Sequence, residues 1–227
     1  MIKHKLLYVH EERIPVNLRS LVLSYLPTTE FEVDTMTYDI PDKEKIKKLE
    51  WAELVLFAPG RFLSDEVMSH AKHIKLMQLW SSGFDKFNTK AATEFGIPVA
   101  NNGGANACSV AEHAILLMLA TYRWLPKSHE RTVTGNWAGN SHGMDMFLMH
   151  KKTLGIIGFG NIGRQVACKA RGFGMKTVYY DINYADPETE RQCEATSMPL
   201  DELLSTADIV TLHLHYNKDT ENILGER

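Results

Sequence analysis

Short apolar runs alternate with longer stretches of helical spacing over the first hundred residues. Runs of about 4–8 apolar or alternating residues are typical of strands, and apolar residues three and four apart are typical of helices. Because each expected helix separates two expected strands, the pattern predicts right-handed crossovers and a parallel sheet. We therefore expect an α/β domain over residues 1–102. Its expected strands are 6–10, 31–36, 54–58, 76–80 and 97–100, and its expected helices are 14–26, 42–49, 64–72 (capped by Ser64) and 90–95.

The cluster NNGG at 101–104 interrupts this pattern, and we place a boundary there between a domain 1–102 and a domain 103–227. A strongly apolar helix is expected over 109–124. The polar stretch 126–149 has no clear periodicity, and we interpret it as a long loop with at most one helical turn. The remaining expected elements are strands 154–157, 177–180 and 208–214, a helix 200–204, polar connections 184–197 and 216–221, and the start of a helix at 222–227.

A glycine motif follows the strand expected at 154–157. Gly158, Gly160 and Gly163 form G-x-G-x-x-G ahead of an amphipathic helix, and Asp181 closes the next strand. This order is typical of a dinucleotide-binding unit, in which the helix N-terminus offers free N–H groups to the pyrophosphate. Asp181 can accept hydrogen bonds from the adenosine ribose and would repel a 2′-phosphate. The sequence therefore favours NAD over NADP; the alternative is a βαβ turn whose glycines serve packing alone.

Composition narrows the class of protein. Hydrophobic residues make up 44% of the chain and the formal net charge is −3, so we expect a soluble globular protein without a basic field for nucleic acid. No apolar run approaches the length of about 18 residues that spans a membrane, and the N-terminus lacks the pattern of a signal peptide. Three widely spaced cysteines indicate free thiols and a cytoplasmic location, with Cys168 serving packing.

Histidines are the other candidates for chemistry. His113 lies in the apolar helix expected at 109–124, where helix packing or capping is the favoured role. His213 and His215 would face the same way at a strand end, so they could form a metal pair, although roles in packing or in a cofactor wall are favoured. We expect no metal site.

Several segments at characteristic spacing resemble the D-isomer-specific 2-hydroxyacid dehydrogenase family. They are SSGFDKFN (81–88), NNGGANACSVAEHAILLMLA (101–120), Trp137, KTLGIIGFGNIGRQVA (152–167), MPLDELLSTADIVTLHLH (198–215) and DTENILG (219–225). The resemblance covers essentially the whole chain. It implies a flavodoxin-like substrate domain followed by an incomplete NAD-binding Rossmann domain.

The resemblance also implies roles for particular residues. Backbone N–H groups at Ser82 and Gly83 would help to hold the carboxylate of a small 2-hydroxy or 2-keto acid. In the second domain, the residues expected along NAD are Gly158, Gly160, Asn161, Ile162, Gly163, Asp181, His213, Leu214, His215 and Thr220.

Two departures from the family pattern accompany the resemblance. His215 and Tyr216 stand where the family usually has Pro and Leu, which removes a restraint on the backbone. The family's catalytic Arg, Glu and His lie beyond the position equivalent to Arg227. We therefore assign no catalytic residue, and we expect a fragment without turnover.

Three functions follow from these observations. The first is an NAD-dependent oxidoreductase that acts on the CH–OH group of a small 2-hydroxy acid. The second is a non-catalytic NAD-binding module of the co-repressor type that forms a homodimer through residues 103–150. The third is a marginal product of a truncated gene, with an exposed apolar sheet edge.

Overall fold

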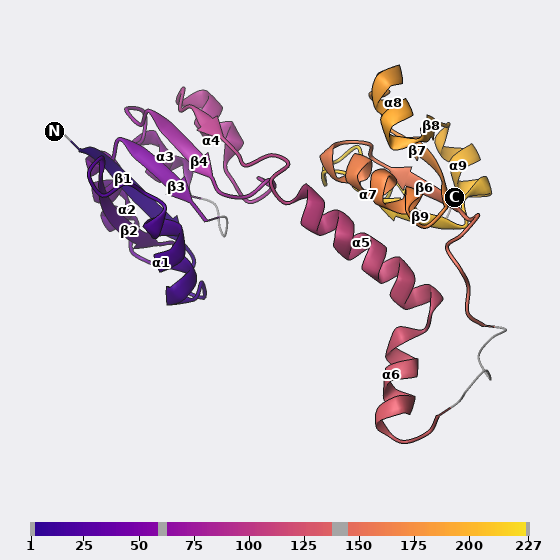
Figure 1. Ribbon diagram of the computed structural model, residues 1–227. Helices are drawn as coiled ribbons and strands as arrows, with labels where there is room; N and C mark the ends of the chain where they lie inside the picture. Colours follow the sequence, from indigo (N-terminus) through magenta and orange to yellow (C-terminus); the bar gives the residue numbers. More distant parts are fainter. Residues whose placement is uncertain (1–2, 59–62, 138–144, 226–227) are drawn as a thin grey trace. The chain divides into compact units, whose positions relative to one another are not determined.

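The protein forms two compact units, residues 1–105 and 106–227, each built around its own parallel sheet (Figure 1). The structure is a computed structural model that describes residues 3–58, 63–137 and 145–225. The prediction of an α/β fold with parallel sheets is confirmed.

The first unit carries a five-stranded sheet in the order β2-β1-β3-β4-β5. This order is that of flavodoxin-like folds, as predicted. Residues alternate along β1, so that Leu7 and Val9 face a core with α2, α3 and α4, while Leu6 and Tyr8 face the core beneath α1. Its elements are β1 (His4–His10), α1 (Val16–Ser24), β2 (Phe31–Thr37), α2 (Asp42–Trp51), β3 (Leu54–Phe57), α3 (Asp65–Ser69), β4 (Leu76–Leu79), α4 (Thr89–Glu94) and β5 (Val99–Ala100).

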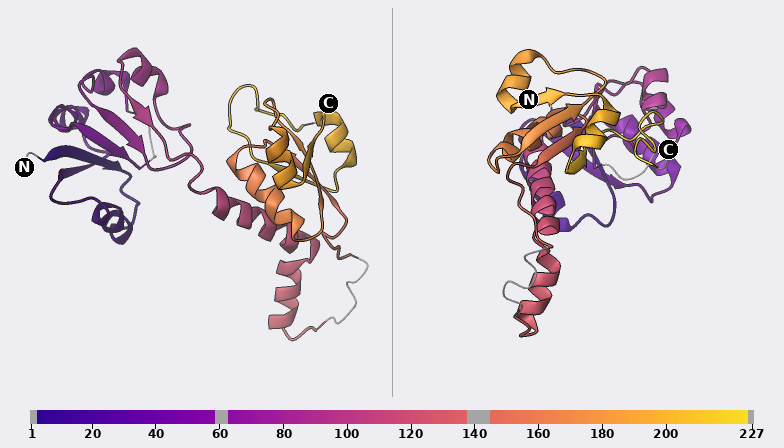
Figure 2. Two further views of the ribbon diagram at one scale, coloured as in Figure 1. Left: turned by 45° about the horizontal axis from the view of Figure 1, so that its top comes forward. Right: turned by 90° about the vertical axis from the view of Figure 1, so that its right-hand side faces the viewer.

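The second unit carries a four-stranded sheet in the order β8-β7-β6-β9. Helices α5 and α7 pack on one face of it, and α9 packs on the other (Figure 2). The fit on the α9 face is close, because a Cβ added at Gly155 of β6 would lie 2.6 Å from Leu203 Cδ2 and 2.9 Å from the Cβ of Ala207. Its elements are α5 (Ala107–Tyr122), α6 (Leu125–Val133), β6 (Thr153–Ile157), α7 (Asn161–Arg171), β7 (Lys176–Tyr180), α8 (Pro187–Cys193), β8 (Ala195–Ser197), α9 (Leu200–Thr206) and β9 (Ile209–Leu212).

Three expectations for the second unit were wrong. Residues 125–133 form the helix α6, which begins after a left-handed Trp124 (φ 50°) and buries none of its side chains. Segment 187–197 forms α8 and β8. Residues 222–225 form turns and bends in place of a helix, and residues 226–227 of that expectation lie outside the described part of the chain.

Candidate functional site

The turn between β6 and α7 combines one glycine of positive φ with one tightly packed glycine. Gly158 has a φ of +94°, and a Cβ there would lie 2.5 Å from the carbonyl oxygen of His213. A Cβ at Gly163 would lie 2.2 Å from the carbonyl oxygen of Gly158. Both positions therefore require glycine in order to bring the helix, the turn and β9 together.

Gly160 differs from its two neighbours. A Cβ at this position meets nothing within 4 Å. Its backbone is extended (φ −79°, ψ −153°), and it precedes the first turn of α7 without a side-chain cap. The protein fold itself therefore leaves the space above Gly160 open, beside N–H groups at a helix N-terminus.

The carboxylate of Asp181 lies beside this turn, at the end of β7. Its Oδ2 accepts a hydrogen bond from the backbone N–H of Phe159 at 2.6 Å, and its Oδ1 accepts one from the N–H of Asn183 at 2.9 Å. The ring of Phe159 stacks on Tyr179, with centroids 3.9 Å apart and an interplanar angle of 16°. The acid and the glycine turn thus form one hydrogen-bonded unit.

Two residues beside the turn were not anticipated from the sequence. Phe159 provides the N–H that Asp181 binds, and the Nε of Arg164 donates to the carbonyl oxygen of Phe159 at 3.0 Å. Arg164 is exposed at the start of α7, where its cation can approach an anion bound at the turn. The signal was the arginine directly after the third glycine in GFGNIGR.

The structure brings the segment after β9 to the same turn. The backbone N–H of His213 donates to the carbonyl of Ile157 at 2.8 Å, and a Cβ at Gly158 would lie 2.9 Å from Leu214 Cδ2. Burial lowers the pKa of the His213 imidazole, and one of its ring nitrogens lies 3.0 Å from the Thr211 hydroxyl.

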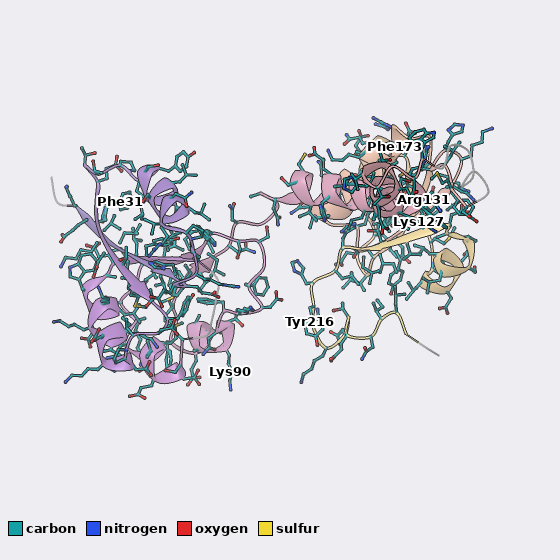
Figure 3. All side chains as sticks on the ribbon, turned by 90° about the horizontal axis from the view of Figure 1, so that it is seen from below. Phe31, Lys90, Lys127, Arg131, Phe173 and Tyr216 are labelled. Atoms are coloured by element: carbon teal, nitrogen blue, oxygen red, sulfur yellow. The ribbon has the colours of Figure 1, made fainter. Side chains whose placement is uncertain are left out.

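Residues 215–220 close into a loop farther along the chain. The Thr220 hydroxyl donates to the carbonyl of His215 at 2.6 Å and receives the backbone N–H of Asn217 at 2.9 Å. Thr220 therefore shapes this loop. Tyr216 lies on the same loop (Figure 3). Its hydroxyl donates to Glu221.

Ser82 and Gly83 belong to the first unit, in the loop after β4. The Ser82 hydroxyl donates to the carbonyl of Asn102 at 2.8 Å, and the Asn101 amide donates to the carbonyl of Ser82 at 2.7 Å. The Ser81 hydroxyl donates to the carbonyl of Gly83 at 2.7 Å. These bonds hold the loop at the carboxyl end of β4, where ligands of parallel sheets commonly bind.

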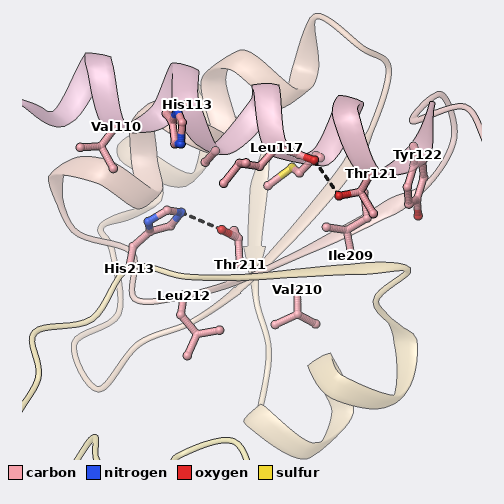
Figure 4. Close-up of a pocket in the computed structure, with 12 residues that line it drawn as sticks. Val110, His113, Leu117, Thr121, Tyr122, Ile209, Val210, Thr211, Leu212 and His213 are labelled. Carbon is pink, nitrogen blue, oxygen red and sulfur yellow. Dashed lines mark hydrogen bonds between the residues drawn. The ribbon is translucent and has the colours of Figure 1, made fainter. Parts of the chain in front are cut away.

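An apolar groove of about 450 Å³ separates α5 from β9 in the second unit (Figure 4). Leu117, Met118 and Ile209 are among its lining residues. His113 and His213 both point into it near one end (Figure 4). The groove suits apolar side chains better than it suits pyrophosphate.

Two absences hold for the residues that the structure describes. Within residues 3–58, 63–137 and 145–225, no group of three His, Cys, Asp or Glu side chains is placed to hold a metal ion. Over the same residues, no helix has both the length and the apolar character needed to cross a bilayer.

The sheet order, the glycine turn and the acid at the end of β7 define a dinucleotide-binding α/β protein. Residues 115–227 match the profile of the D-isomer specific 2-hydroxyacid dehydrogenase, NAD binding domain. The chain belongs to the D-isomer specific 2-hydroxyacid dehydrogenase family.

Relatives of known structure and activity agree with this assignment. Glyoxylate reductase of Thermococcus gammatolerans is 34% identical over 203 residues, which is 87% of this chain and 60% of that protein. Hydroxypyruvate reductase of Thermotoga maritima is 32% identical over 195 residues, with 86% and 61% covered. The crystal structure of D-lactate dehydrogenase from Aquifex aeolicus, complexed with NAD and lactic acid, superposes with a TM-score of 0.74 at 28% identity, with 95% and 62% covered. The chain thus spans about 60% of the length of these two reductases.

Proposed function

We propose that residues 106–227 bind NAD across the glycine turn, with the pyrophosphate above Gly160 and the adenosine ribose on Asp181. The open space above Gly160 is the observation that carries this proposal. Gly158 and Gly163 are explained by packing within the protein, whereas the fold gives no reason for glycine at 160. Asn161, Ile162 and Gly163 supply the backbone of the first helical turn, while His213, Leu214, His215 and Thr220 line the cofactor on the β9 side.

The test compares alanine at two ends of the same helix. Gly160→Ala leaves the fold intact and weakens NAD binding at least about tenfold, as measured by calorimetric titration. Gly172→Ala is the matched control, because Gly172 ends α7 in a right-handed conformation that alanine adopts. A Cβ there would lie 3.3 Å from the Lys169 carbonyl oxygen, a close contact that a shift of a few tenths of an ångström relieves. Equal NAD affinity of wild type and Gly160→Ala would overturn the proposed site.

Asp181 supports a preference for NAD over NADP. An ionised carboxylate has about four acceptor positions, and Phe159 and Asn183 occupy two of them. The remaining lone pairs can accept from ribose hydroxyls, and their negative charge opposes a 2′-phosphate. We expect NADP to bind more weakly than NAD in parallel titrations.

The substrate of the whole protein is proposed to be a small 2-hydroxy or 2-keto acid. The support is the chemistry that the names of its relatives state: reduction of glyoxylate and hydroxypyruvate, and a structure holding lactic acid. NAD supplies or accepts the hydride in such a reaction. The backbone of Ser82 and Gly83 would hold the substrate carboxylate.

Turnover by these 227 residues alone is a separate question. The expectation of no turnover stays a prediction, and the assay is NADH oxidation with glyoxylate, pyruvate and hydroxypyruvate. A rate of about 1 s⁻¹ or more would contradict it.

A second candidate function, a homodimer through 103–150, is supported by exposed apolar side chains. Leu125 and Val133 lie at the two ends of α6, and both are more than half exposed. Lys127 and Arg131 share this helix (Figure 3). Residues 138–144 of the proposed interface lie outside the described part of the chain.

Sedimentation velocity tests this interface with and without NAD. The double variant Leu125→Ser/Val133→Ser is expected to lower the dimer fraction, whereas Val16→Ser, at a similarly exposed position in α1, leaves it unchanged. NAD-dependent dimerisation without turnover would favour the binding-module function over the enzyme.

A further inference from the structure

Two cysteines of the second unit meet across the packing of α7 and α8. Cys168 lies on α7 and Cys193 is the last residue of α8, 25 positions later in the sequence. Their Sγ atoms are 3.6 Å apart. Helix α7 follows the glycine turn directly, and α8 follows the loop that begins at Asp181.

The two thiols differ in exposure. Cys193 is 5% exposed and belongs to the core beneath α7, with its Sγ 3.9 Å from the carbonyl oxygen of Arg164. Cys168 is only partly buried, so part of this residue meets solvent. The pair therefore joins a partly exposed cysteine to a buried one.

We propose that Cys168 and Cys193 form a reversible disulfide when the protein meets a peroxide. A disulfide has an S–S length of about 2.05 Å, so the two sulfurs need to approach by roughly 1.5 Å. Rotation of the two side chains, with a small shift of α8 against α7, supplies a movement of this size.

The reaction proceeds in two balanced steps with hydrogen peroxide as the oxidant. The Cys168 sulfur attacks one peroxide oxygen, the O–O bond breaks, and sulfenic acid and one water form. The Cys193 sulfur then attacks the sulfenic sulfur of Cys168, the S–O bond breaks, and the second water leaves. Two thiols and one peroxide thus give one disulfide and two waters, and the sulfurs lose two electrons.

The environment of Cys193 decides which of the two thiols reacts first. Burial, followed by the hydrogen bond with Cys168, raises the pKa of the Cys193 thiol to about 11. Its thiolate is therefore scarce near neutral pH, so of these two thiols Cys168 reacts with peroxide first. Disulfide closure should accelerate as the pH rises toward the pKa of Cys193.

The cross-link would join two segments that flank the proposed NAD site without touching the ligand. It connects the helix after the glycine turn to the helix after Asp181. This inference does not depend on NAD binding, and its test does not use the cofactor.

The test uses the full chain with Cys108→Ser, because Cys108 is exposed and would react first. The protein is treated with hydrogen peroxide, denatured, alkylated and weighed intact. The expected product has lost about 2 Da, takes up no alkylating reagent, and yields one peptide pair linked through Cys168 and Cys193. Dithiothreitol should restore two alkylatable thiols.

A second variant separates the two steps. Cys108→Ser/Cys193→Ser is expected to stop at the sulfenic acid of Cys168, which dimedone traps. Circular dichroism before oxidation checks that each variant is folded. The proposal is overturned if both thiols survive, if Cys168 advances to sulfinic acid without a disulfide, or if the cross-link joins two chains.

Discussion

The carboxylate of Asp181 holds the backbone N–H of Phe159 at 2.6 Å, so the acid at the end of β7 closes the turn that follows β6. The two residues are 22 positions apart. Asp181 was expected to accept hydrogen bonds from the ribose of NAD. It therefore also has a structural role, because it binds the N–H of Phe159 before any ligand is present. Its replacement should change stability and binding together.

Substitutions at Asp181 separate these two contributions. Asp181→Ala is expected to lower the free energy of unfolding by about 1–2 kcal/mol, because the N–H of Phe159 loses its acceptor. Asp181→Asn retains one acceptor oxygen for this N–H and should keep most of the stability. It also removes the charge that opposes a 2′-phosphate, so NADP affinity should approach that of NAD. Urea unfolding and parallel titrations measure the two effects; unchanged stability of Asp181→Ala would contradict the structural role.

Gly163→Ala should destabilise the second unit strongly. The added Cβ would lie 2.2 Å from a backbone oxygen, and relief requires α7 to move away from the turn. We expect a loss of about 3 kcal/mol in thermal or urea unfolding. Gly172→Ala in the same helix is the control and should fall within about 0.5 kcal/mol of wild type.

Two buried tyrosines in the first unit should respond differently to loss of the hydroxyl. The Tyr38 hydroxyl donates to the carbonyl of Ala58 at 3.0 Å, whereas the buried hydroxyl of Tyr8 has no hydrogen-bond partner among the described residues. Tyr38→Phe is expected to cost about 1–2 kcal/mol, because it removes the hydroxyl that donates to the carbonyl of buried Ala58.

Tyr8→Phe is the matched comparison for that loss. It keeps the ring and removes an unpaired polar group, so stability should stay equal or increase. Urea unfolding of both variants is the measurement. A larger loss for Tyr8→Phe than for Tyr38→Phe would show that the Tyr8 hydroxyl binds an acceptor.

Glu53 should contribute a pH-dependent part of the stability. Hydrogen bonds from Lys75 at 2.6 Å and from His4 at 3.2 Å lower the pKa of its carboxyl from about 4.5 to about 2. A pKa that folding lowers gives stability that is complete above about pH 4.5 and is lost as the pH falls toward 2. Glu53→Gln should therefore be less stable than wild type at pH 6, and the difference should shrink by pH 3.

The control for Glu53→Gln is a variant that removes one carboxylate charge elsewhere in the same unit. Glu12→Gln removes a carboxylate from an exposed position after β1. Its difference from wild type should vary less between pH 6 and pH 3. Moderate salt should weaken the Glu53 effect, because Lys75 and His4 are both exposed.

The sequence predicted those elements whose signal lies in local pattern. The apolar runs correctly predicted the strands β1, β3, β4 and β6. Ser64 caps α3 as expected, since its side chain accepts the N–H of Val67. The glycine motif located the turn between β6 and α7, because Gly158 and Gly163 each answer a local steric need. The parallel pairing of the strands also followed, since helices alternate with short apolar runs.

The elements that the sequence did not predict, α6, α8 and β8, lack a regular spacing of buried apolar residues. Helix α6 buries no side chain, so its sequence gave no hydrophobic stripe, although Pro126 marks its first turn. The pair Asp186-Pro187 was the local signal for the start of α8. Asp186 caps this helix by accepting the N–H of Thr189 at 2.9 Å. Strand β8 has only three residues, and its place beside β7 depends on long-range pairing.

The site was predictable as a motif and less so as a set of contacts. Nothing in the local sequence indicated that Asp181 binds the N–H of Phe159, because the two meet only when β6 and β7 pair. The approach of Cys168 to Cys193 likewise depends on how α8 packs on α7.

Gly155 and Gly163 are both crowded, but they differ in whether a second substitution can compensate for their replacement. The neighbours of Gly155 are the side chains of Leu203 and Ala207, so smaller residues there could make room for alanine at 155. The neighbour of Gly163 is the carbonyl oxygen of Gly158, which every amino acid carries. No second substitution can remove this backbone oxygen. A lineage can therefore exchange Gly155 through paired changes, whereas loss of Gly163 is repaired only by reversion or by rebuilding the turn.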